Sequence, residues 1–142
     1  MKNFILIIVL LNLVNLKNIS NKVTEETRDE YLVFNVTATV YNATVDQCNS
    51  DPLTTADGSY IEISDIDNLN WIAVSRDLLR DGLSYGDVVE LIHSDSTICG
   101  LYEIHDCMNK RWTRRIDILM SDDIKTGRWE NVKLRKLIRK RD

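Results

Sequence analysis

The stretch GLYEIHDCMNKRWTRRIDILM, residues 100–120, places two apolar segments on either side of a basic loop. GLYEIHD and IDILM are rich in β-branched and aromatic residues, so each is predicted to form a short strand. Asp106 and Asp117 stand eleven residues apart, with five basic or aromatic side chains between them. This stretch predicts a strand–loop–strand unit that carries a pair of carboxylates. The alternative is a loop whose charges are only solvated.

The rest of the chain predicts further short strands and little helix. Segments of similar composition lie at residues 32–41, 71–74, 88–92 and 129–134. Residues 42–59 contain the only proline and an Asp-Gly turn signal, so they are expected to be a long loop. Residues 75–84 predict one helical turn with Ser75 as a possible cap. Together these features predict an all-β fold, a small six-stranded barrel with short helical turns.

The N-terminal segment has the pattern of a secretory signal. Lys2 precedes an apolar run of about a dozen residues and a polar end, which predicts a signal peptide over residues 1–20 and a linker over 21–33. The run is shorter than the roughly 20 apolar residues that a membrane-spanning helix needs. Because no clear cleavage site follows, the alternative is that the segment is retained as an N-terminal anchor. We expect an exported protein of the periplasm, cell envelope or extracellular space, which meets a membrane only through a retained anchor.

Charge is unevenly distributed along the chain. Residues 21–124 carry 8 basic and 20 acidic side chains, whereas residues 125–142 carry 8 basic and 2 acidic ones. Because acidic side chains dominate residues 21–124, this part of the chain is a poor partner for nucleic acid. The basic end could favour an anionic surface, or it could simply be a solvated terminus.

Three cysteines, Cys48, Cys99 and Cys107, would be exposed to an oxidising compartment after export. On one strand, Cys99 and Cys107 would be about 26 Å apart at roughly 3.3 Å per residue, so they cannot pair. Any bridge would therefore involve Cys48. A His105–Cys107 nucleophile pair lacks an orienting group, and the spacing of these residues matches no common zinc pattern. We expect neither a metal nor a cofactor.

Six segments resemble, in order and spacing, the 3D (three-aspartate) domain of the double-psi β-barrel group: VTATVYNAT, TTADGS, WIAVSRDLL, YGDVVEL, GLYEIHDCMN and RRIDIL. This group includes the catalytic domain of lytic transglycosylase A, the rare lipoprotein A domain and the expansins. The resemblance covers about residues 34–135 and implies a six-stranded double-psi β-barrel, followed by a basic tail over 136–142. A monomer is expected.

The three family aspartates would fall on Asp77, Asp106 and Asp117. The resemblance implies that Asp117 is the catalytic acid, that Asp106 raises its pKa and holds it, and that Asp77 has a supporting, structural role. The implied reaction is lytic transglycosylase cleavage of the β-1,4 bond between N-acetylmuramic acid and N-acetylglucosamine in peptidoglycan. A single carboxyl group can serve this reaction as acid and then base. Each aspartate could instead be a turn or cap residue.

Five other residues are candidates for contact with a sugar polymer. Two lie in the first expected strand and three in the basic loop: Thr37, Tyr41, Asn109, Arg111 and Trp112. Tryptophan can stack on a sugar ring and arginine can bind a carboxylate, although ordinary packing is the alternative for each. The basic loop departs from the small, glycine-rich loop of the family. Arginines near Asp117 would also lower its pKa, which opposes a general acid.

Two further function classes stay open. The same barrel could be a non-catalytic cell-wall or carbohydrate-binding module, as in the expansins. It could also be an interaction or structural protein in which the aspartates only brace the fold. Release of anhydromuropeptides from peptidoglycan separates the enzyme from both.

Overall fold

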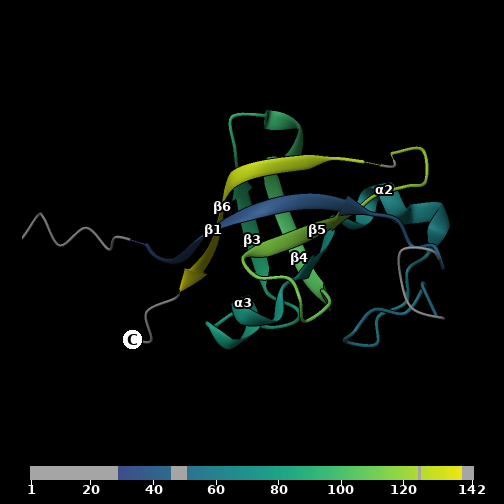
Figure 1. Cartoon of the computed structure of the whole chain (residues 1–142), viewed down its shortest axis with the longest axis horizontal. Helices are drawn as coiled ribbons and strands as arrows, with labels where there is room; N and C mark the ends of the chain where they lie inside the picture. The colour runs from purple at the N-terminus through teal and green to yellow at the C-terminus, as the bar shows by residue number, and fades with distance from the viewer. Residues whose placement is uncertain (1–28, 46–50, 125, 139–142) are drawn as a thin grey trace, which may run out of the picture. The chain divides into compact units, whose positions relative to one another are not determined.

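The computed structural model describes residues 29–45, 51–124 and 126–138. The chain divides into two units, Met1–Glu30 and Tyr31–Asp142, and the fold described below is that of the second. Its strands are β1 (Glu30–Tyr41), β2 (Trp71–Val74), β3 (Val88–Ile92), β4 (Gly100–Cys107), β5 (Arg115–Leu119) and β6 (Arg128–Ile138). They close into a barrel in the order β1-β5-β2-β4-β3-β6 (Figure 1). The predicted all-β, six-stranded barrel is confirmed.

Short helices connect the strands, as the sequence predicts. They are η1 (Ile63–Asp65), α2 (Ile66–Leu69), α3 (Arg76–Arg80) and η2 (Ser96–Ile98). Ser75 stands at the N-cap position of α3 but makes no capping hydrogen bond through its side chain. Its hydroxyl accepts a hydrogen bond from the Arg115 amide at 3.1 Å instead, so the side chain joins α3 to β5. Ser75 therefore occupies the expected cap position but does not cap α3 through its side chain.

The barrel contains both parallel and antiparallel strand pairs, and its shortest strand, β2, links the two strands that carry the expected acids. β1 pairs with β5 and β2 pairs with β4 in parallel, whereas β2–β5, β3–β4 and β3–β6 are antiparallel. β2 has only four residues, WIAV, and lies between β4 and β5. The two strands that carry the expected pair of aspartates are therefore joined through β2.

Alternate residues of each strand point into the barrel, and these inward residues are apolar. Burial of one aliphatic or aromatic side chain contributes roughly 1.5–3 kcal/mol. The buried cluster consists of Phe34, Val36, Ala38, Ile72, Val74, Leu78, Leu83, Val89, Leu91, Ile98, Tyr102, Ile104, Ile116, Ile118, Val132 and Leu134.

A second, smaller apolar cluster lies apart from this core. It joins the loop and short helices before β2 to side chains of β1, β2 and β5, and its buried members are Tyr41, Ile61, Ile66, Ala73, Met108 and Leu119. Ala73 alternates with Ile72 and Val74 of the interior core, so it faces the outside of the barrel. This second cluster supports the surface on which both expected acids are found.

The strands at both ends of the domain extend past their expected limits. β1 begins at Glu30, inside the expected 21–33 linker, and Leu32 packs against the interior core. β6 reaches Ile138, past the expected boundary at residue 135. The expected signal segment over 1–20, most of the linker, and Cys48 lie outside the described residues. Within the described ranges, Cys99 and Cys107 are free thiols and no helix is long and apolar enough to cross a membrane.

Candidate active site

Asp106 and Asp117 lie in one row across the outer face of the barrel. Ala73 of β2 is the register partner of Asp106 in β4 and also of Asp117 in β5. Asp117 is in turn the partner of Thr39 in β1, so four neighbouring strands contribute one residue each. With neighbouring strands about 4.8 Å apart, the two aspartate Cα atoms are roughly 10 Å apart. The methyl group of Ala73 lies between the two acids.

A β-bulge in β4 makes this row possible. Ile72 pairs with Ile104, but the next residue of β2, Ala73, pairs with Asp106, so His105 is an extra residue in β4. Ile104 points into the barrel, and strict alternation would turn Asp106 inward as well. The extra residue turns Asp106 outward beside Ala73 instead. Bulges occur often next to active sites because they redirect a side chain in this way.

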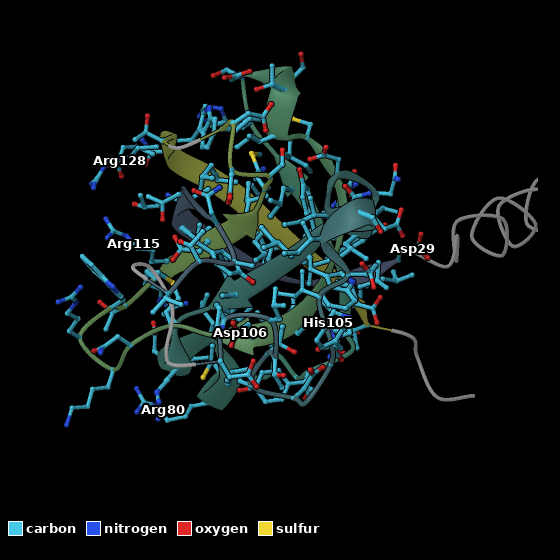
Figure 2. All side chains as sticks on the ribbon, turned by 90° about the vertical axis from the view of Figure 1, so that its right-hand side faces the viewer. Asp29, Arg80, His105, Asp106, Arg115 and Arg128 are labelled. Carbon is cyan, nitrogen blue, oxygen red and sulfur yellow. The ribbon has the colours of Figure 1, made fainter. Side chains whose placement is uncertain are left out.

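Both acids line one cavity of about 510 Å³. Figure 2 shows Asp106 between Arg115 and His105 in that view of the barrel. The expected sugar contacts Tyr41, Asn109, Arg111 and Trp112 also line the cavity. Residues that were not expected in this site complete its wall: Asp51, Pro52, Thr54, Ala73, Arg76, Cys107 and Met108. The cavity therefore combines three carboxyl groups, those of Asp51, Asp106 and Asp117, with guanidinium groups and aromatic rings.

Asp117 is a partly buried acid, and its surroundings have opposing effects on its pKa. Burial raises its pKa above the ordinary value, while a hydrogen bond from the Thr39 hydroxyl and the nearby charge of Arg115 lower it. Burial outweighs both, and the net pKa is raised. The predicted effect of a nearby arginine is thus present but does not decide the outcome. A raised pKa is what a carboxyl group needs to donate a proton near neutral pH.

Asp106 is held by the backbone. Its Oδ1 accepts hydrogen bonds from the amides of Cys107 at 2.8 Å and Ala56 at 3.0 Å. Burial raises the pKa of Asp106, these two hydrogen bonds lower it, and the charges of Asp57 and Asp117 raise it further. The net pKa is raised. Both amides bind Oδ1 of a side chain that lines the cavity.

Asp77 lies in α3, away from the cavity lining. Its Oδ2 accepts the backbone amide of Arg114 at 3.0 Å, and the Arg114 guanidinium lies 3.5 Å from the same oxygen. Arg114 has a positive φ of 49°, a conformation that non-glycine residues rarely adopt. Burial raises the pKa of Asp77, but hydrogen bonds from Ser75 and the Arg114 amide hold it below its usual range. Asp77 therefore fixes the backbone just before β5 begins.

The basic loop between β4 and β5 is built around Trp112. The Trp112 amide donates to the Asn109 carbonyl at 3.0 Å, and the Asn109 side chain accepts the Arg111 amide at 3.1 Å. The guanidinium carbons of Arg111 and Arg115 lie 4.9 and 4.0 Å from the Trp112 ring centroid. These cation–π contacts order the basic side chains at the edge of the cavity.

Thr37 is not brought to this cavity. It shares the outer face of β1 with Thr39, but it is the register partner of Arg115 rather than of Asp117. Its hydroxyl donates to Glu130 of β6 at 2.6 Å. A direct sugar contact by Thr37 in this cavity is therefore not supported by its position.

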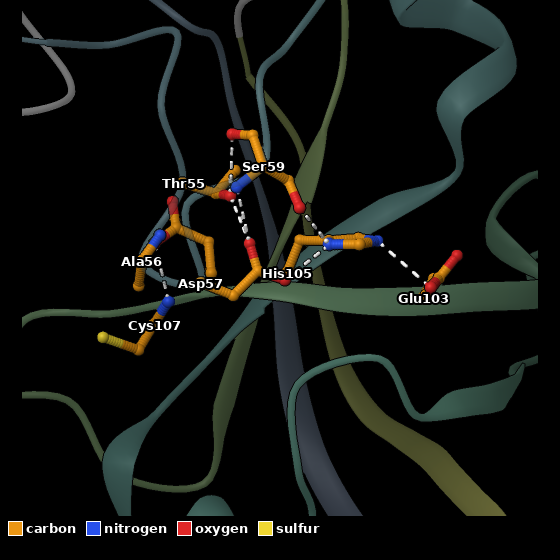
Figure 3. A network of polar contacts seen from close by, with 8 residues as sticks. Thr55, Ala56, Asp57, Ser59, Glu103, His105 and Cys107 are labelled. Carbon is orange, nitrogen blue, oxygen red and sulfur yellow. Dashed lines mark hydrogen bonds and ion pairs between the residues drawn. The ribbon is translucent and has the colours of Figure 1, made fainter.

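A polar network beside Asp106 was missed in the sequence (Figure 3). His105 Nδ1 lies 2.7 Å from Asp57 Oδ2 and 3.1 Å from the Ser59 hydroxyl. A serine–histidine–aspartate triad needs the serine and the aspartate on different ring nitrogens, so this group is not one. The Asp-Gly turn signal marks the turn, but nothing in the sequence links it to His105. Among the described residues, no group of three or more His, Cys, Asp or Glu side chains could hold a metal ion.

No protein-family model matches this chain, and no curated protein matches it either. Its function must therefore be inferred from the geometry of the cavity and the chemistry of the residues that line it.

Proposed function

We propose that this protein is an exported, peptidoglycan-active member of the three-aspartate group of double-psi barrels, and that it cleaves the glycan as a lytic transglycosylase does. The observation that carries the proposal is the shared register partner of Asp106 and Asp117, which sets both carboxyls in one cavity. Both have raised pKa values, and pairs of perturbed acids in a cleft favour a catalytic role. Such a substrate implies that the protein acts outside the cytoplasm.

In this mechanism, Asp117 acts as acid and then as base. The protonated carboxyl donates its proton to the glycosidic oxygen as the bond from this oxygen to the anomeric carbon breaks. The resulting carboxylate accepts the proton of the muramic C6 hydroxyl while O6 forms a bond to the anomeric carbon. The product is a 1,6-anhydro sugar, no water is consumed, and Asp117 is protonated again for the next cycle. Usual glycoside hydrolases instead need two carboxyl groups.

Other cavity residues have roles that fit this substrate. Asp106, held by two backbone amides, can accept a hydrogen bond from the sugar or carry negative charge near the developing oxocarbenium ion. Trp112 offers a ring for stacking on a sugar. Arg76 and Arg111 line the cavity and can bind carboxylates of the wall polymer.

A second candidate function is glycan binding without cleavage. The hydrogen bond from Thr39 and the charge of Arg115 both favour the ionised form of Asp117. An Asp117 that stays ionised would accept hydrogen bonds from sugar hydroxyls but could not start the reaction. This observation gives a binding module on the same barrel a physical basis.

Digestion of purified peptidoglycan sacculi tests the two functions. Wild-type protein should release anhydromuropeptides, detected by mass spectrometry, and Asp117→Asn should release none while it still sediments with the sacculi. Thr37→Val is the matched control, since Thr37 lies outside the cavity, and it should retain activity. Sedimentation without any product from wild type would favour the binding module. If the wild-type protein released no product and did not sediment with the sacculi, both functions would be excluded.

A further inference from the structure

The carboxylate of Asp106 depends on a loop that is distant in sequence. One of its two amide donors, Cys107, is its neighbour in the chain, but the other, Ala56, lies fifty residues earlier. This second donor belongs to the 54–60 loop, which the isolated bridge between Thr54 and Tyr60 closes on itself. The position of Asp106 is therefore tied to the position of this loop.

Asp57 organises the 54–60 loop from within. Its Oδ1 accepts the Thr55 hydroxyl at 2.7 Å and the Ser59 amide at 3.0 Å. Together with the contact to His105, these hydrogen bonds outweigh burial and lower the pKa of Asp57 to about 2. Asp57 is thus a carboxylate over the pH range in which most enzymes work, and its Oδ2 is directed out of the loop toward β4.

His105, the extra residue of the bulge, connects the loop to the strand. Its Nδ1 lies 2.7 Å from Asp57 Oδ2, and its carbonyl accepts the Asp57 amide at 3.3 Å. The imidazole ring lies against the ring of Trp71 in β2, with centroids 4.0 Å apart, and its Nε2 is 3.3 Å from a Glu103 carboxylate oxygen. Figure 3 shows His105 between the loop and Glu103. The ring is therefore fixed by contacts with two strands and one loop.

We propose that the 54–60 loop is a positioning device for Asp106, and that His105 and Asp57 are the positioning residues that hold it closed. The bulge has two effects at once: it turns Asp106 toward the cavity and presents His105 to the loop. The loop then returns the Ala56 amide to Asp106 Oδ1 and so holds in place a carboxyl group that lines the cavity. The contacts among the 54–60 loop, His105 and Asp106 do not depend on the proposed function, whereas their effect on catalysis rests on it.

Nuclear magnetic resonance can test the device without any substrate. In the full chain, the Ala56 amide proton should shift with pH in step with the carboxyl carbon of Asp106, and Asp106→Asn should abolish this shift. His105→Phe keeps a ring against Trp71 but loses the contact with Asp57. It should uncouple Ala56 from Asp106 and speed hydrogen exchange of the Ala56 amide roughly tenfold or more. Glu103→Gln, which changes the other side of the His105 ring, should keep the coupling.

An Ala56 amide that still follows Asp106 in His105→Phe, or does not follow it in wild type, would overturn the proposal. Should His105→Phe not fold, Asp57→Ala removes the same contact from the exposed loop and must give the same loss. In the glycan assay, His105→Phe should lower kcat roughly ten- to hundredfold with little change in KM, because a small displacement of a reacting group is costly. Coupling in wild type without glycan cleavage would refute the proposed function and leave the positioning of Asp106 standing.

Discussion

Thr39 and Asp117 lie opposite each other on the parallel strands β1 and β5, and the Thr39 hydroxyl donates a hydrogen bond to Asp117 Oδ1. The bond stabilises the carboxylate and lowers the pKa of Asp117, against the larger effect of burial. Thr39 therefore limits how far burial can raise the pKa of Asp117. The balance between the two decides up to which pH Asp117 keeps its proton.

Thr39→Val should raise the pKa of Asp117 further, because it removes a donor to the charged form. The protonated fraction then persists to higher pH, so the alkaline limb of the pH–activity profile should move upward. The carboxyl carbon shift of Asp117 provides the same measurement in the absence of substrate. Thr37→Val, on the same strand face but bonded to Glu130, should leave both unchanged. A downward shift in Thr39→Val would contradict this account.

Asp117→Asn should stabilise the fold at neutral pH while it removes activity. Because the pKa of Asp117 is raised on folding, its protonation favours the folded state below the unfolded pKa, and this contribution is lost as pH rises through the folded pKa. Thermal unfolding at pH 7 should thus show a higher Tm for the variant, with the difference vanishing in acid. An equal or lower Tm at pH 7 would show that the folded protein does not disfavour the charge of Asp117.

Asp77→Ala should destabilise the protein by about 1–3 kcal/mol, the usual effect of losing a charged hydrogen-bond partner. It leaves the Arg114 amide without its acceptor while Arg114 keeps a positive φ. The folded pKa of Asp77 is lowered, so its stabilisation is present above the unfolded pKa and lost as pH falls through the folded pKa. Urea unfolding at pH 7 and in acid measures this. Asp81→Asn, which contacts only the exposed Arg114 side chain, should change stability by less than about 0.5 kcal/mol.

Trp112→Ala should weaken binding to a soluble glycan fragment roughly five- to tenfold, because stacking on an aromatic ring is worth about 1 kcal/mol. It should also leave the side chains of Arg111 and Arg115 less ordered, since both lie against the indole. Trp112→Phe preserves a ring and should recover most of the affinity. Titration calorimetry of the three proteins gives the comparison, and an unchanged affinity in Trp112→Ala would place the sugar elsewhere in the cavity.

The six-stranded barrel could be predicted because local composition and global fold agree. Residues 32–41, 88–92 and 116–120 are dense in β-branched and aromatic side chains, and all three lie almost entirely in strands of the barrel. The spacing of Asp106 and Asp117 also indicated two strand-borne acids. Residues 63–69 carry few helix signals, and the short helices there depend on packing of Ile66 in the second apolar cluster.

The geometry of the site could not be predicted in the same way. Alternation along β4 assigns Asp106 to the interior, because Ile104 is buried there, and the sequence does not show that His105 is an extra residue. Ala73 is equally inconspicuous, since its importance comes only from pairing with strands on both sides. The Asp57–His105 contact joins positions 48 residues apart and forms only when the loop lies on the barrel.

The bulge in β4 adds one residue, His105, to the strand, while Asp106 and Cys107 stay paired with Ala73 and Val74 of β2. Deletion of the single codon for His105 would restore regular alternation and place Asp106 directly after the inward Ile104, so Asp106 would still face outward beside Ala73. The ring that contacts Asp57 of the 54–60 loop would be lost. Length variation at this position is therefore a change by which a barrel of this kind can gain or lose the contact with a neighbouring loop while its acid stays on the outer face.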